Sequence, residues 1–69
     1  MDSLKKDLGK KLREIREQKG FTQAELAEKS NIHVNYYARV ERGEVNSTVE
    51  VLQRIAKTLN IKSSEILPF

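Results

Sequence analysis

Asn35 and Arg39 carry side chains that can recognise another molecule through paired hydrogen bonds. An asparagine amide can bond an adenine edge in this way, and an arginine guanidinium can donate two hydrogen bonds to a guanine. Val34, beside them, can press on the methyl group of a thymine. Each good paired contact discriminates between bases by about 1–3 kcal/mol. These residues could therefore read a base sequence, provided that one helix presents them outward together.

The segment that holds these residues, 22–43 (TQAELAEKSNIHVNYYARVERG), predicts two short helices joined by a tight turn. Thr22 and Glu25 have the spacing of a capping box, which starts the first helix. Asn31 tolerates a left-handed backbone and suits the turn. The second helix is expected from about residue 33 or 34 to 41. This is the layout of a helix-turn-helix, which places its second helix in the major groove of DNA.

Two longer helices are expected around this motif. Residues 4–19 hold Leu4, Leu8, Leu12 and Ile15 on one face, with Gly9 close to that face, and Gly20 provides the stop. A fourth helix begins near residue 48, capped by Ser47 or Thr48, and a short turn covers 63–67. Its core stripe is Val49, Leu52, Ile55, Ala56 and Leu59. The predicted fold is a single all-α domain, residues 1–69, with about five helices.

Composition narrows the classes of function. The chain has 69 residues, no cysteine and one histidine, which excludes disulfides and thiolate zinc sites and makes an all-protein metal site unexpected. The chain has no cysteine nucleophile, its only histidine has no triad pattern and no phosphate-cradling glycine loop appears, so we expect no catalysis, no metal and no cofactor. The net charge of +3 is compatible with a nucleic-acid partner without demanding one. Without a membrane-length apolar run or a secretion signal, a cytoplasmic protein is expected.

Four segments, taken together, resemble the lambda-repressor-like bacterial regulators of the XRE family. They are LGKKLREIREQKG, FTQAELAEKSNI, YYARVERG and LQRIAKTLNI, and they follow the family's order and spacing over nearly the whole chain. The run IHVNYYARVERG is also similar to controller proteins of restriction–modification systems. The resemblance implies a compact five-helix lambda-repressor-like DNA-binding domain, acting at the nucleoid of a bacterium or a phage host. Tyr37 departs from the family, which usually has an aliphatic residue there, and Asn31 stands where glycine is common.

The resemblance also implies which residues meet double-stranded DNA. The base-reading residues would be His33, Val34, Asn35 and Arg39, and the phosphate contacts would come from Gln23, Tyr36, Asn46, Ser47 and Thr48. Plainer roles stay open: a solvated surface for Asn35 and Arg39, a helix cap for His33, and capping for Ser47 and Thr48. Arg16 and Glu41 match a partly buried ion pair between the first and third helices. The alternative for Arg16 is a phosphate contact.

One short recognition helix reads too few bases to select a site in a genome, so a homodimer on a (pseudo)palindromic operator is expected. Its interface is predicted from apolar residues left after helix packing, namely Val51, Ile66, Leu67 and Phe69; alternatively, the last three cover the monomer's core. The expected function is a sequence-specific transcriptional regulator, a repressor or an activator that contacts RNA polymerase. It could be the autoregulating controller of a restriction–modification system. The alternative is an antitoxin-type module that binds a toxin and its own promoter.

Overall fold

Residues 2–66 are described by the computed structural model, with side chains from residue 4 onward. Within that part the elements are α1 (Asp2–Gln18), α2 (Gln23–Lys29), α3 (Val34–Glu41), α4 (Val49–Leu59) and the 3₁₀ turn η1 (Ser63–Glu65). The all-α prediction agrees with this architecture. The count of five helices is not confirmed, because the fifth element is a single turn of three residues.

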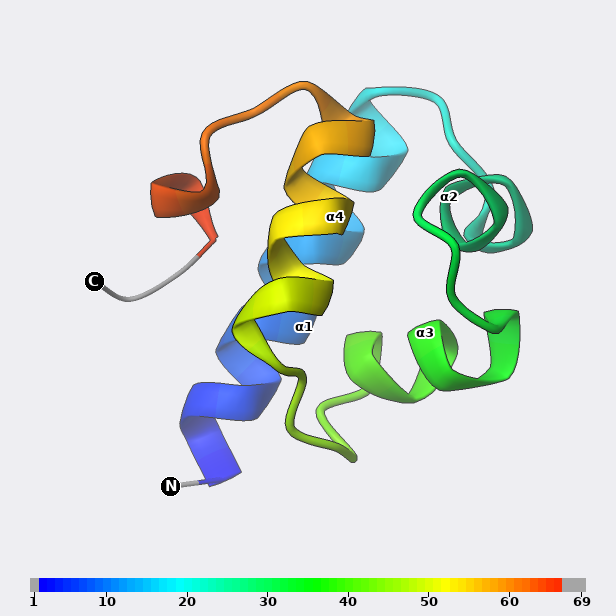
Figure 1. The fold of residues 1–69 in the computed structure, drawn as a ribbon. Coiled ribbons are helices and arrows are strands. Elements are labelled where there is room, and N and C mark those ends of the chain that lie inside the picture. The colour runs from blue at the N-terminus through cyan, green and yellow to red at the C-terminus, as the bar shows by residue number, and fades with distance from the viewer. Residues whose placement is uncertain (1, 67–69) are drawn as a thin grey trace.

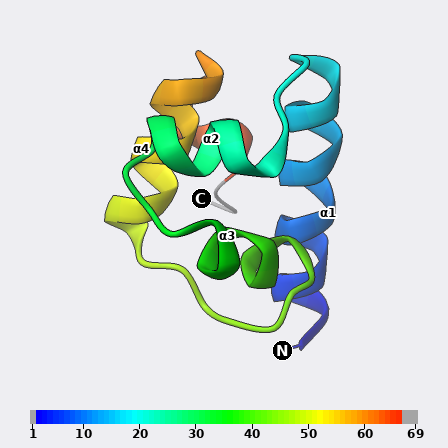
Figure 2. The ribbon, with the colours of Figure 1, turned by 90° about the vertical axis from the view of Figure 1, so that its right-hand side faces the viewer.

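Helices α2 and α3 lie across one side of the molecule, between α1 and α4. Figure 2 shows them one above the other, with α4 on one side and α1 on the other. In Figure 1 the turn η1 lies on the opposite side of α4 from α2 and α3. This arrangement leaves the outer side of α3 at the edge of the molecule, where no other helix covers it.

The turns around α2 follow from the local sequence. The capping box is present, since Thr22 Oγ1 accepts from the amide of Glu25 at 3.0 Å and the Glu25 carboxylate accepts from the amide of Thr22 at 2.8 Å. Gly20 (φ 80°) ends α1 and Asn31 (φ 58°) turns the chain toward α3, both in the left-handed region. The predicted stop, cap and turn are therefore confirmed.

One buried cluster joins the four helices. It consists of Leu12, Leu26, Ala27, Tyr37, Val40, Leu52, Ile55, Ala56, Leu59 and Ile66. Of the residues predicted for the core stripes, Leu8 and Ile15 are partly buried and pack against this cluster, whereas Leu4 is 58% exposed and Val49 is 47% exposed. The prediction that these two residues belong to the core was wrong, because Leu4 lies near the start of α1 and Val49 begins α4, where the core does not reach.

Gly9 allows α1 to touch the end of α3 directly. A Cβ atom at this position would lie 2.6 Å from the carbonyl oxygen of Val40 and closer still to that of Glu41. No side chain fits in that space, because the nearest atoms are backbone rather than the flexible end of a side chain. This close packing places α3 against α1 next to Glu41.

An ion pair between Arg16 of α1 and Glu41 of α3 completes this contact. The Nε atom of Arg16 donates to Oε2 of Glu41 at 2.6 Å, and the side chains are only 11% and 4% exposed. Arg16 also donates to the backbone carbonyl of Phe21 at 2.7 Å. Gln23, the first residue of α2, donates to Oε1 of Glu41 at 3.0 Å. A single carboxylate therefore ties three helices together.

The charges of this cluster stabilise each other. Burial alone would raise the pKa of Glu41, but hydrogen bonds from Arg16 and Gln23, together with the nearby Tyr37 hydroxyl, outweigh it and hold that pKa below its usual value. The hydrogen bond to Glu41 likewise raises the pKa of Arg16. The Tyr37 hydroxyl is buried beside this carboxylate, and burial raises its pKa. No partner reaches the Tyr37 hydroxyl with the geometry of a full hydrogen bond, so its interaction with Glu41 is a loose one.

Replacing Glu41 by Gln is expected to lower the free energy of unfolding by about 3–5 kcal/mol, because Arg16 would lose its buried partner and keep only a 4.0 Å contact with the exposed Glu17. Urea unfolding at neutral pH measures the loss. The matched control is Glu44→Gln, which breaks the ion pair between Arg42 and Glu44, whose side chains are 56% and 46% exposed. That change should cost less than about 1 kcal/mol. Equal losses in the two variants would contradict the structural role of Glu41.

The same comparison has an expected pH dependence. Because the pKa of Glu41 is lowered on folding, its carboxylate stabilises the fold fully above the pKa of an unfolded glutamate, about 4.3. That contribution is lost as the pH falls through the lowered folded value. The difference in stability between the parent chain and Glu41→Gln should therefore stay constant down to about pH 5 and shrink in more acidic buffer. A difference that does not change across the acid range would overturn this assignment.

Candidate nucleic-acid interface

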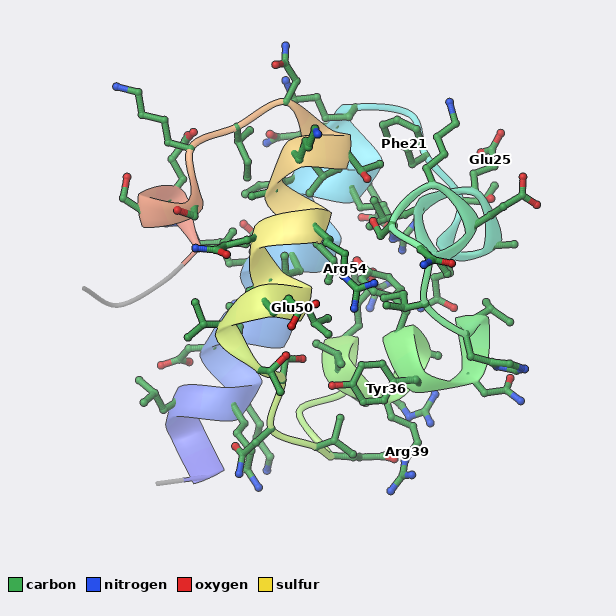
Figure 3. All side chains as sticks on the ribbon, viewed as in Figure 1. Phe21, Glu25, Tyr36, Arg39, Glu50 and Arg54 are labelled. Carbon is green, nitrogen blue, oxygen red and sulfur yellow. The ribbon has the colours of Figure 1, made fainter. Side chains whose placement is uncertain are left out.

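The outer side of α3 brings together the four residues that were predicted to read bases. His33, Val34, Asn35 and Arg39 are all exposed, whereas Tyr37, Val40 and Glu41 of the same helix are buried. Figure 3 shows Arg39 directed away from the body of the molecule. The helix therefore presents donors, acceptors and one aliphatic side chain on its outer side, while its inner side is fixed by the core.

His33 caps α3, which was the plainer role left open for it. Its Nδ1 atom accepts from the amide of Asn35 at 3.1 Å. This nitrogen therefore carries no proton in the cap, and Nε2 is the atom that can bond a ligand. The cap also fixes the backbone of Asn35 at the first turn of the helix, from which a groove-bound helix reaches base edges.

Gln23 borders a polar cleft of about 250 Å³, which is also lined by Arg13, Arg16, Glu17, Glu41 and Arg42. One hydrogen of its amide is donated to Glu41, and the second remains for another acceptor. The side chains of Arg13 and Arg42 are more than half exposed, although each is paired with a glutamate, Glu17 and Glu44. A phosphate oxygen next to Gln23 would thus find an amide donor and positive charge within one cleft.

Tyr36 differs from the base-reading residues because it is only partly exposed. Its ring packs against the core cluster, and in Figure 3 it points from α3 toward the side of α4. The hydroxyl is the part of this residue that can reach a phosphate.

The loop before α4 divides the predicted phosphate contacts. Asn46 and Thr48 are exposed, and Thr48 caps α4 by accepting from the amide of Val51 at 3.1 Å. The hydroxyl of Ser47 is buried and has no hydrogen-bond partner. Ser47 instead lines an apolar groove of about 290 Å³ with Leu8 and Ile66. In this arrangement the Ser47 hydroxyl is closed off from a phosphate, and Thr48 rather than Ser47 caps α4.

Sequence reasoning missed Glu44. Its carboxylate accepts from Nε of Arg42 at 2.7 Å and lies 3.6 Å from Nε of Arg39. The hydrogen bond from Arg42 lowers the pKa of Glu44, and the charges of Arg42 and Arg39 lower it further. The sequence feature that could have indicated this contact is the cluster of opposite charges at positions 39, 42 and 44. The spacing alone does not show which of these groups meet.

The residues predicted for a dimer contact separate into three cases. Ile66 is 5% exposed within the single chain, so it belongs to the monomer's core, as the alternative had it. Val51 is partly exposed on α4 and packs against the cluster. Leu67 and Phe69 lie outside the described residues.

Two further kinds of site are absent from residues 2–66. No group of three or more His, Cys, Asp or Glu side chains in this range could hold a metal ion. Nor does this range contain a helix with the length and apolar character needed to span a membrane.

Known proteins resemble this chain in sequence and in fold. The immunity repressor of Bacillus phage phi105 is 35% identical over 60 residues, which is 87% of this chain and 42% of the repressor. The control protein C.BamHI of Bacillus amyloliquefaciens is 32% identical over 62 residues, or 88% of this chain and 76% of that protein. The chain spans about half the length of several curated relatives, between 42% and 55%.

The solved structure of the restriction–modification controller protein C.AhdI from Aeromonas hydrophila superposes with a TM-score of 0.92 at 32% identity, and the match covers 96% of each chain. The family model described as helix-turn-helix matches residues 12–66, which include every helix from the middle of α1 to η1. The chain therefore belongs to the helix-turn-helix family.

Proposed function

We propose that the chain is a sequence-specific, double-stranded DNA-binding transcriptional regulator whose α3 enters the major groove. The observation that carries this proposal is the exposed polar side of α3, opposite a buried side fixed to α1 through Glu41. Relatives named as repressors, transcriptional regulators and control proteins support the same function. In this proposal the DNA-binding surface of α3 already has its orientation before DNA binds.

Each residue has a distinct role in this proposal. Asn35 reads an adenine, Arg39 reads a guanine and Val34 packs on a thymine methyl group. His33 adds a contact through Nε2 while it caps the helix. Gln23, Tyr36, Asn46 and Thr48 meet backbone phosphates and fix the register without reading sequence. Ser47 would join them only if its loop moved on binding.

Within this family, we assign the chain to the controller proteins of restriction–modification systems. The support is the match to C.AhdI over 96% of both chains and the match to C.BamHI over 76% of that protein. A regulator of this size can repress by occupying the promoter of its own gene, and it can activate by contacting RNA polymerase from a neighbouring site. The bacterial and phage relatives support a site of action at the nucleoid in the cytoplasm of a bacterium.

Selection of binding sites from random duplexes should recover one preferred sequence for the parent chain. Asn35→Ala and Arg39→Ala should each relax the preference at a different base pair, with a loss of about 1–3 kcal/mol for the parent site. Gln53→Ala, an exposed change on α4, is the control and should leave the preference intact. The affinity of the parent for any duplex should fall at least about tenfold between 50 and 200 mM salt, if two or more phosphates are neutralised.

Two results would argue against the proposal. A parent chain that binds no duplex even in dilute buffer does not use α3 as a DNA-reading helix. Preferences that stay the same in the Asn35 and Arg39 variants would move base reading to another surface.

We further propose that the chain acts as a homodimer through α4. Two recognition helices on a two-fold axis would read half-sites about 34–36 Å apart. On α4, Val49 is 47% exposed and Val51 is partly exposed, although both are apolar. Leu67 and Phe69 can extend this contact, while Ile66 is used by the monomer's own core.

Val51→Glu is expected to convert a dimer to a monomer in sedimentation equilibrium, because association would bury an unpaired charge in the interface. Gln53→Glu introduces the same charge at an exposed position of α4 and should leave the dimer intact. Thermal melting at low concentration checks that both variants fold. A dimer that survives Val51→Glu would exclude this part of α4 from the contact.

A further inference from the structure

Glu44 lies directly after the recognition helix and is held there by the backbone. Gly43 adopts a left-handed φ of 73° and ends α3, and its amide donates to the carbonyl of Val40 at 3.0 Å. The amide of Glu44 then donates to the carbonyl of Arg39, also at 3.0 Å. This pair of bonds is a Schellman-type ending, so the main chain of Glu44 is fastened to that of Arg39.

The turn is also packed against α1. A Cβ atom on Gly43 would lie 2.8 Å from Cγ of Lys6 and 2.9 Å from its Cα. Gly43 therefore sits directly on the first helix, and the backbone of Glu44 starts from a fixed point rather than from a free loop.

The side chain of Glu44 connects the two arginines at this end of α3. Arg42 holds both carboxylate oxygens, with Nε to Oε2 at 2.7 Å and a terminal nitrogen to Oε1 at 3.4 Å. Oε1 then lies 3.6 Å from Nε of Arg39. The carboxylate is thus oriented by one arginine and faces the other.

We propose that Glu44 is a positioning residue that holds the Arg39 guanidinium in place for reading a base and so increases sequence discrimination. This inference rests on the proposed role of α3 as the DNA-reading helix. The contact engages Nε of Arg39, so the two terminal nitrogens are left to bond a guanine end-on. A guanidinium that is already oriented loses less conformational freedom on binding than a freely rotating one.

The charge of Glu44 acts in the same direction. An ionised carboxylate beside Arg39 partly neutralises it and repels phosphates, which weakens attraction to DNA of any sequence. The pairing is compatible with a guanine, whose O6 and N7 atoms accept hydrogen bonds without carrying a full charge. Arg39 is therefore biased toward a base and away from the backbone.

The test measures, for each variant, the ratio of affinities for the selected site and for the same site changed at the base pair that Arg39 reads. That base pair is identified first with Arg39→Ala. Glu44→Gln and Glu44→Asp should each lower the ratio about two- to fivefold, the range expected for an exposed ion pair. Glu44→Asp keeps the charge but shortens its reach to Arg39. Glu14→Gln, which removes an exposed charge from α1, should leave the ratio unchanged.

Three outcomes would overturn the role of Glu44 while leaving the proposed function intact. The affinity ratio could be unchanged in Glu44→Gln, or it could equal that of the parent in Glu44→Asp. The effect of Glu44→Gln could also persist when Arg39 is already replaced by alanine. A parent-like Glu44→Asp would show that only the charge matters and not the position. If the parent chain binds no duplex, or if Arg39→Ala changes no preference, the proposed function itself fails and the role of Glu44 fails with it.

Discussion

The buried pair of Arg16 and Glu41 is the interaction on which the rest of this structure depends. Two charges removed from water are costly unless they meet each other and have their remaining hydrogen bonds satisfied. Here the Arg16 guanidinium also donates a hydrogen bond to the backbone carbonyl of Phe21. The Glu41 carboxylate also accepts a hydrogen bond from the side-chain amide of Gln23. The pair therefore requires α1, the turn after it, α2 and α3 to be in place together, which links the orientation of the recognition helix to the folding of the whole domain.

This arrangement separates the two sides of α3. The inner side is occupied by Tyr37, Val40 and Glu41, and contact with α1 is so close that only glycine fits at position 9. The exposed residues on the outer side are not needed for packing of the core. Their identities can therefore differ according to the DNA sequence that is read. A small domain with a limited core gains from this design, because one helix serves both the core and the interface.

Much of the fold was predictable, because local rules determine it. Thr22 with Glu25, Gly20 and Asn31 each have a short-range backbone requirement that a sequence displays directly. The site was less predictable, because its details depend on which distant groups meet. From local sequence alone, Ser47 would be expected to be exposed. Its hydroxyl is instead buried beside a groove, which is formed partly by residues near both ends of the described range. The pairing of Glu44 with Arg39 and Arg42 depends on rotamers that spacing does not specify.

The central claim is that DNA meets the outer side of α3 while its inner side stays fixed to α1. Chemical-shift mapping by NMR during titration with a duplex tests this most directly. The account predicts that the shifts concentrate on His33, Asn35 and Arg39, on Gln23 at the start of α2, and on residues 46–48, with little change around Arg16 and Tyr37. Shifts centred instead on the groove beside Leu8 and Ile66, with α3 unaffected, would contradict it.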